Sequence, residues 1–153
     1  MCDSMTIRRA TRGDLDLLVE FNLRMAMETE DLQLEREVLE RGIEGIFKFT
    51  DRGFYLVAEI DGMVVGSLMV TTEWSDWRNG DFWWVQSVYV RPEFRRRGVF
   101  TRLFHHVRES AHQADRVCGY RLYVEKENLA AQATYQKLGF EETHYRLYES
   151  CFR

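Results

Sequence analysis

The sequence is poor in the features that mark membrane, secreted and multidomain proteins. It has one proline, Pro92, and no serine-, glycine- or proline-rich stretch that would link two domains. Its three cysteines, Cys2, Cys118 and Cys151, are widely spaced, as is typical of reduced thiols rather than of disulfide or metal frameworks. No apolar run approaches the roughly 18 residues that cross a bilayer, and the N-terminus has no signal-peptide core. We therefore expect one cytoplasmic domain, residues 1–153, without metal or membrane partner.

The side chains that are present favour a single globular core with its charge sorted along the chain. Of the 153 residues, 45% are hydrophobic and 14% aromatic, which is enough for one sizeable core. The net charge is −4. Yet residues 91–108 carry six arginines against one acid, whereas residues 28–44 carry seven acids against two arginines. The low net charge therefore conceals a basic segment and an acidic one.

Hydrophobic periodicity predicts ten elements in the order β-α-α-β-β-β-α-β-α-β. The expected strands cover residues 6–10, 53–60, 63–74, 82–90, 120–125 and 142–149, and the expected helices 12–28, 34–49, 98–112 and 129–138. Asp61-Gly62 and Asn79-Gly80 predict hairpin turns, Thr11 with Asp14 has the spacing of a capping box, and two glycines predict a bend or break in the second helix. The fold class is α/β with a mixed sheet, in which a central antiparallel meander is followed by one parallel β-α-β crossover.

The segment VRPEFRRRGVF, residues 90–100, follows the third strand of the meander and opens the next helix. A helix N-terminus has backbone N–H groups without intrahelical partners, and the helix dipole adds positive potential there. Together these features form an anion site. Gly98 would let a ligand approach the backbone, and the arginines would add contacts to phosphate. From charge alone, a solvated arginine face or a nucleic-acid patch also fits, although the acidic chain shows no nucleic-acid motif.

Two motifs in this half of the chain resemble a known family. VYVRPEFRRRGVFTRLFHHV is similar to the acetyl-CoA-binding motif of the GCN5-related N-acetyltransferase (GNAT) superfamily, and LYVEKENLAAQATYQKLGF is similar to that family's next motif. The order of elements fits the family from about residue 6 to residue 149. Two positions depart from the family pattern. Phe100 stands where Gly or Ala is usual, and Val85-Gln86-Ser87 stands where many members carry an acid.

The resemblance implies a fold of the GNAT type and acetyl-CoA as cosubstrate, with no metal. It implies that acetyl-CoA lies against the end of the meander and the following turn. The cofactor-binding residues would be Val88, Tyr89, Val90, Arg95, Arg96, Arg97, Gly98, Val99, Phe100, Thr101, Asn128 and Tyr135. The strand backbone would pair with the amide-rich pantetheine arm and donate to the developing oxyanion. Asn128 also fits a plain helix N-cap.

The resemblance further implies that Tyr135 hydrogen-bonds the leaving sulfur, although its spacing also fits core packing. The attacking amine must lose a proton, and we expect Glu28 or Glu73 as catalytic base, with Glu30 and Asp76 as further candidates. Gln86 would orient a water. The segment EWSDWRNGDFWW, residues 73–84, holds four tryptophans and three acids, which suits a cationic amine. The expected acceptor-binding residues are Glu28, Glu30, Trp74, Asp76, Trp77 and Gln86.

The sequence therefore predicts an N-acetyltransferase that moves an acetyl group from acetyl-CoA to an amine of a small molecule or peptide, by direct attack on the thioester. Two alternatives stay open: a non-catalytic acyl-CoA-binding sensor, and an acyltransferase for a longer chain. The acidic balance favours no nucleic-acid partner. A homodimer is expected only by analogy with the family.

Overall fold

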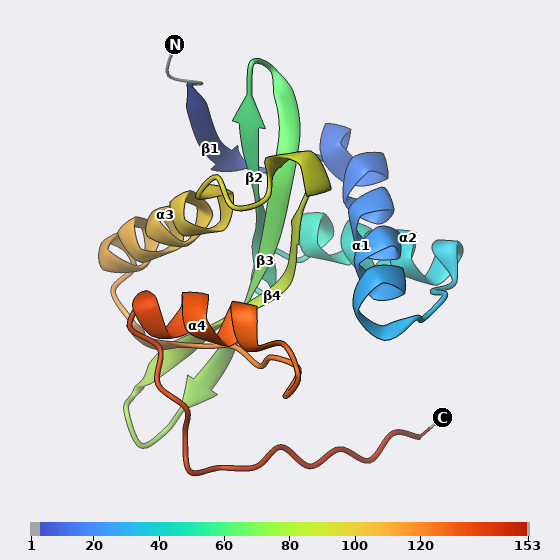
Figure 1. The fold of residues 1–153 in the computed structure, drawn as a ribbon. Coiled ribbons are helices and arrows are strands. Elements are labelled where there is room, and N and C mark those ends of the chain that lie inside the picture. Colours follow the sequence, from blue (N-terminus) through green and yellow to red (C-terminus); the bar gives the residue numbers. More distant parts are fainter. Residues whose placement is uncertain (1–3, 153) are drawn as a thin grey trace. The chain divides into compact units, whose positions relative to one another are not determined.

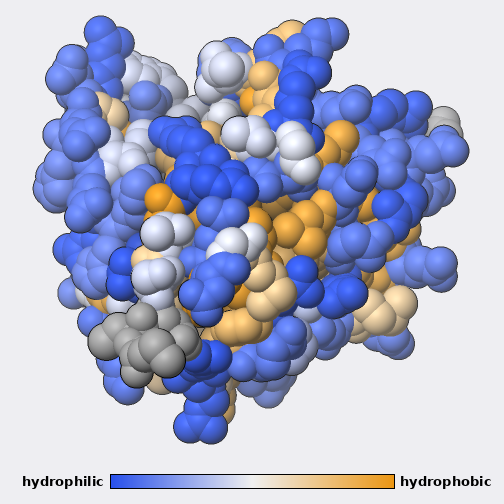
Figure 2. Space-filling model, turned by 90° about the horizontal axis from the view of Figure 1, so that it is seen from above, coloured by the Kyte–Doolittle hydropathy of each residue, from blue (hydrophilic) through white to orange (hydrophobic). Residues whose placement is uncertain are grey.

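The computed structural model describes residues 4–152 (Figure 1). It divides into two compact units, Met1–Leu122 and Tyr123–Arg153, and each unit is described by itself. In the described chain, no helix is long and apolar enough to cross a membrane. On the face shown in Figure 2, hydrophilic residues cover most of the surface and apolar ones reach it mainly in the middle.

The first unit is built on a mixed sheet, as the sequence predicts. Within residues 4–152 the sheet has five strands in the order β1-β2-β3-β4-β5. The first three pairings are antiparallel and the pairing of β4 with β5 is parallel. The strands are β1 Met5–Arg9, β2 Gly53–Ile60, β3 Met63–Ser75, β4 Gly80–Val90 and β5 Val117–Arg121. Strand β5 ends before residue 125, where the predicted strand ends, since its ladder with β4 stops at Trp84 and Arg121.

Helices cover both faces of this sheet (Figure 1). The short 3-10 helix η1 (Arg12–Asp14), α1 (Leu15–Glu30) and α2 (Arg36–Lys48) precede β2, and η2 (Pro92–Phe94) and α3 (Val99–Gln113) lie between β4 and β5. Helices α1 and α2 lie on one side of the sheet and α3 on the other. Of the predicted bend or break in the second helix, the break is wrong, because α2 runs as one helix through its glycines. Gly45 instead allows close packing, since a Cβ there would lie 2.9 Å from Arg52 Nη1.

The core follows the alternation of side chains along the strands. On the α1 side, the buried cluster consists of Leu18, Val19, Phe21, Ile43, Tyr55, Val57, Val64 and Tyr89. Helix α3 buries a stripe at helical spacing, namely Val99, Leu103, Phe104, Val107 and Ala111. Apolar side chains cover both faces of the sheet, so the central strands β2, β3 and β4 are packed against helices on both sides.

Both predicted hairpin turns form. Asp61 and Gly62 have φ values of 51° and 79°, and Ile60 pairs with Met63, as in a two-residue turn of type I′. The second hairpin closes through the pairing of Ser75 with Gly80 and is therefore longer at its tip.

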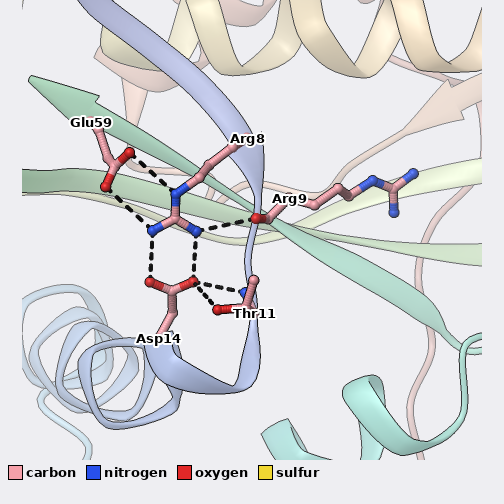
Figure 3. Close-up of polar contacts among 5 residues, drawn as sticks. All are labelled: Arg8, Arg9, Thr11, Asp14 and Glu59. Atoms are coloured by element: carbon pink, nitrogen blue, oxygen red, sulfur yellow. Dashed lines mark hydrogen bonds and ion pairs between the residues drawn. The ribbon is translucent and has the colours of Figure 1, made fainter. Parts of the chain in front are cut away.

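A polar network fastens β1 to β2 and to the start of α1 (Figure 3). The guanidinium of Arg8 donates to both carboxylate oxygens of Asp14, at 2.7 and 2.9 Å, and to Glu59 at 3.2 Å. The backbone N–H of Thr11 donates to the same Asp14 carboxylate at 2.7 Å, which confirms the predicted capping box. Arg8 holds the pKa of the buried Asp14 carboxyl below its ordinary value.

The second unit holds helix α4 (Leu129–Lys137), which the sequence predicts. Asn128 caps this helix, because its Oδ1 accepts the N–H of Ala131 at 3.1 Å. The predicted strand over residues 142–149 is wrong, since residues 141–152 carry no strand. A strand needs a neighbour with which to share its backbone hydrogen bonds, and the described part of this unit contains no other strand.

Candidate cofactor turn and acceptor-side residues

Strand β4 is distorted where the resemblance places the thioester arm. Gln86 pairs with Met69 and Tyr89 with Ser67, so Ser87 and Val88 together face a single residue of β3. Ser87 has a φ of 51°, in the left-handed region that non-glycine residues seldom adopt. This combination is a β-bulge, and bulges cluster at functional sites.

Beyond the bulge, β4 is no longer paired with β5. The parallel ladder covers Asp81 to Trp84, whereas β4 continues to Val90. The last residues of β4 therefore have backbone N–H and C=O groups that point away from β3, on the edge where the ladder with β5 has already ended. An edge of this kind can hydrogen-bond an extended amide-containing ligand as an added strand would.

The turn after β4 brings the N-terminus of α3 to the surface. Arg96 and Gly98 both adopt positive φ values, 63° and 77°. The first helical hydrogen bond runs from the N–H of Arg102 to the carbonyl of Gly98, at 3.0 Å. The N–H groups of Val99 and Thr101 precede that bond, in the first turn of α3, where a helix offers no intrahelical acceptor to its N–H groups. We call residues 95–101 the cofactor turn. Its donors and the dipole of α3 suit an anionic group.

Space in the cofactor turn is left open at Gly98. A Cβ at this glycine would meet no heavy atom within 4 Å. Phe100, which replaces the small residue usual in the family, packs instead along the helix, with its ring 6.2 Å from that of Phe104 and nearly parallel to it. The bulky Phe100 is therefore half-buried and packs beside the buried stripe of α3.

The arginines of this region divide into two groups. Arg91 donates from Nε to the carbonyl of Val64 at 2.9 Å. Arg95 donates from Nε to the carbonyl of Val90 at 2.9 Å and from Nη2 to Glu28 Oε2 at 2.6 Å. Arg96 and Arg97 lie on the exposed part of the cofactor turn. The sequence does not distinguish these roles, because the four arginines are of one type within one short segment.

The candidate acids all lie near the surface, and most are held by neighbours. Glu28 is paired with Arg95, and Glu73 is paired with Arg121, whose guanidinium lies 3.7 Å from the centre of the Phe82 ring. Asp76 accepts the backbone N–H of Trp77 at 2.9 Å. Glu30 is the last residue of α1.

The expected acceptor-binding residues do not come together. Trp74 and Trp77, which are 52% and 86% exposed, lie at the tip of the β3–β4 hairpin. Glu28 lies beside the opposite end of β4, because Arg95 joins it to the carbonyl of Val90. The ten residue steps from Gly80 to Val90 span about 33 Å at the usual rise of a strand. Glu28 and the hairpin tryptophans therefore cannot contact the same small acceptor.

Besides Gln86, which the sequence names, two buried polar residues that sequence reasoning missed lie in α1 and β2, namely Asn22 and Tyr55. Gln86 Nε2 donates to Thr71 Oγ1 at 2.6 Å. Asn22 Nδ2 donates to the carbonyl of Leu18 at 2.9 Å and contacts Tyr55 Oη at 3.4 Å. Burial raises the pKa of Tyr55, which therefore stays protonated. In the sequence, Asn22 could have indicated a buried polar group, because it interrupts an otherwise apolar helical face.

In the second unit, the Tyr135 ring meets the Phe140 ring edge to face, with centroids 6.0 Å apart. Burial raises the pKa of Tyr135 above its ordinary value. A raised pKa makes the phenol a weaker acid. Such a phenol is suited to donate a hydrogen bond rather than to release its proton.

Comparisons with known proteins place the chain in a family. The model of the acetyltransferase (GNAT) family matches residues 19–140. Two curated relatives are uncharacterized N-acetyltransferases from Archaeoglobus fulgidus (31% identical over 86% of this chain and 89% of the relative) and Methanocaldococcus jannaschii (30% identical over 90% of this chain). The chain spans 61% of the length of the second relative. A crystal structure described as a possible acetyltransferase from Clostridium difficile 630 is 42% identical, with a TM-score of 0.90 over 97% of this chain and 98% of that one.

More distant solved structures share the fold and were determined with coenzyme A ligands. A predicted acetyltransferase from Clostridium acetobutylicum, with acetyl-CoA, is 18% identical, with a TM-score of 0.79 over 96% of each chain. An aminoglycoside N-acetyltransferase in complex with CoA is 21% identical, with a TM-score of 0.78 over 98% of this chain and 96% of that one. The family match, together with the mixed sheet and the turn at the start of α3, shows that this chain belongs to the GNAT acetyltransferase family.

Proposed function

We propose that residues 1–153 form one catalytic domain that transfers the acetyl group of acetyl-CoA to an amine of a small molecule or peptide. The observation that carries this proposal is the cofactor turn, where α3 begins directly after a strand edge that is unpaired with β5. Family membership supports acetyl-CoA as the cosubstrate, and the N–H donors of the cofactor turn support binding of its phosphates there.

The residues present fit the phosphates and the amide-rich arm of acetyl-CoA. The N–H groups of Val99, Phe100 and Thr101 would face the diphosphate, with the side chains of Arg96 and Arg97 at its rim. The edge of β4 at Val88, Tyr89 and Val90 would bind the arm through backbone hydrogen bonds. Asn128 would add its side-chain amide, although that side chain already caps α4.

The cosubstrate supplies an acetyl group activated as a thioester. The amine nitrogen attacks the acetyl carbonyl carbon, so that a C–N bond forms, the C–S bond breaks, and the thiol and an amide are the products. In this scheme the β4 backbone N–H groups stabilise the developing oxyanion. Tyr135 donates a hydrogen bond to the sulfur as negative charge develops there.

The amine must also lose a proton, and we assign its removal to Glu73 acting through water. Thr71 and Glu73 are two residues apart on β3 and therefore point to the same face of the sheet. Gln86 bonds to Thr71 on that face and is suited to orient the water. Glu28 is less suited to this role because Arg95 joins it to Val90, at the end of β4 far from Gln86 and Thr71.

Thermal unfolding with and without ligand tests the proposal. At a hundredfold excess of acetyl-CoA over its dissociation constant, binding adds about 2.7 kcal/mol, which is a rise of roughly 5–10 °C for a domain of this size. An equal concentration of ATP should give no comparable rise. If acetyl-CoA gives no rise, the proposal is wrong.

A positive scan leads to a panel of amines with thiol release as the readout. Thiol release that needs an added amine supports the transferase. Binding without release across a broad panel supports the acyl-CoA sensor, which the absence of an acid at Gln86 favours. A series of acyl-CoA lengths separates an acetyltransferase from an enzyme for longer chains.

A further inference from the structure

The side chain of Arg95 joins two parts of the first unit that are far apart in sequence. Its Nε donates to the carbonyl of Val90, the last residue of β4, at 2.9 Å. Its Nη2 donates to Glu28 Oε2 in the last turn of α1, at 2.6 Å. The Arg95 guanidinium carbon also lies 5.6 Å from the centre of the Tyr89 ring. One side chain thus bridges the cofactor strand and α1.

The end of α1 that this bridge reaches forms a wall of a cavity. Helix α1 ends at Glu30, and the next residue, Asp31, has a left-handed backbone conformation. The N–H of Asp31 donates to the carbonyl of Met27, and the N–H of Leu32 donates to the carbonyl of Ala26. A cavity of about 960 Å³ opens beside it, and its lining includes Leu23 and Met27 of α1 and residues 33–37. Moving the last turn of α1 would change the shape of this cavity.

We propose that Arg95 and Glu28 are positioning residues, which fix the last turn of α1 against the cofactor turn so that cosubstrate binding orders the α1 side of the site. This inference rests on the proposed function. Arg95 opens the cofactor turn, and a diphosphate held by the N–H groups that follow restricts the backbone of that turn. The Arg95 side chain then starts from a fixed backbone, so that its pairing with Glu28 costs less conformational entropy.

The same contacts separate this role from the two roles that the motif suggests for these residues. A guanidinium that already donates from Nε and Nη2 to protein groups has fewer donors left for a phosphate. Glu28 is held by this guanidinium at the end of β4 opposite to Glu73, to which the proposed function assigns the proton of the amine. Both residues are 40–44% exposed at their side chains, so the pair is moderate in strength and can be broken without unfolding the protein.

Hydrogen exchange on the full chain, with CoA as the probe, tests the coupling. In the wild-type protein, CoA should slow exchange in residues 95–101 and, by about two- to fivefold, in residues 27–32, which is the range that an exposed ion pair can supply. In Arg95→Ala and in Glu28→Gln, CoA should still protect residues 95–101 but no longer residues 27–32. The double variant should behave like either single variant. Glu30→Gln removes the same charge two residues away and should keep the coupling.

Each contrary outcome has a distinct meaning. If CoA protects neither segment in the wild-type protein, the proposed function itself fails. If CoA protects residues 95–101 alone in the wild-type protein, the proposed function stands and this inference is overturned. If Arg95→Ala weakens CoA binding by about tenfold or more while Glu28→Gln does not, Arg95 is a phosphate ligand, since hydrogen bonds to charged groups contribute at that level, and the inference is again overturned.

Discussion

Replacing Gly98 by alanine separates two reasons for a glycine in the cofactor turn. The glycine has a φ of 77°, which an L-residue adopts at a cost of about 1–2 kcal/mol. A Cβ there meets no protein atom within 4 Å, so that no steric cost is added in the free protein. Gly62 in the β2–β3 hairpin is a matched control, with a φ of 79° and equally open space. Both variants should therefore lose about 1–2 kcal/mol of unfolding free energy, or roughly 2–8 °C in Tm.

The two variants should differ in ligand binding. If the diphosphate lies against Gly98, the new methyl group occupies ligand space, and the Kd for acetyl-CoA should rise by about tenfold or more in Gly98→Ala, since displacing one charge-assisted hydrogen bond has that effect. Gly62→Ala should leave the Kd unchanged. Chemical denaturation of each variant measures the free energy of unfolding. Isothermal titration calorimetry of the folded variants with acetyl-CoA measures the Kd. Equal Kd values for the two variants would refute the placement of the diphosphate at Gly98.

Three further predictions follow from the contacts described. Asp14→Asn should lower the free energy of unfolding at neutral pH by about 2 kcal/mol, because Arg8 and the Thr11 N–H lose a charged acceptor. Since the folded state lowers the pKa of Asp14, this stability is present above about pH 4 and is lost as the pH falls through the lowered value. The free energies of unfolding of the wild-type protein and the variant, measured by denaturant titration, should therefore converge in acid. Joint replacement of Arg96 and Arg97 by alanine should weaken CoA binding and flatten its salt dependence in calorimetry, and an unchanged salt dependence would count against a phosphate contact. Tyr135→Phe should reduce kcat by about tenfold or more with little change in the Kd for acetyl-CoA, as expected for a hydrogen bond to a charged sulfur. An unchanged kcat would exclude that role.

The fold could be predicted from the sequence where the signals are local. The alternation of apolar residues marked β2, β3 and β4 within one or two residues of their bounds, and Asp61-Gly62 marked the first hairpin. The capping box at Thr11 and the cap at Asn128 also came from local spacing. These features depend on a few adjacent residues, which is why the sequence alone shows them.

The features that sequence reasoning missed or predicted wrongly depend on partners that are distant in the sequence. The segment 142–149 has the composition of a strand, but a strand forms only where another offers a ladder. The bulge at Ser87 has no glycine or proline to mark it, since a serine carries the positive φ. The pairing of Arg95 with Glu28 joins residues 67 positions apart, and no spacing rule reaches that distance. The expected acceptor residues were grouped by composition, and the length of β4 separates them.

The sheet order has a consequence for how the chain folds. Because strands β2, β3 and β4 are neighbours in sequence as well as in space, their contacts close short loops and can form early. Strand β5 must wait for α3, since a parallel neighbour is reached only through a crossover. A ribosome that has released residues up to Val90 has already presented the whole meander, before α3 and the β5 edge exist. Pulse-labelled hydrogen exchange during refolding should therefore show protection in β3 and β4 before β5, and simultaneous protection of all three would contradict this order.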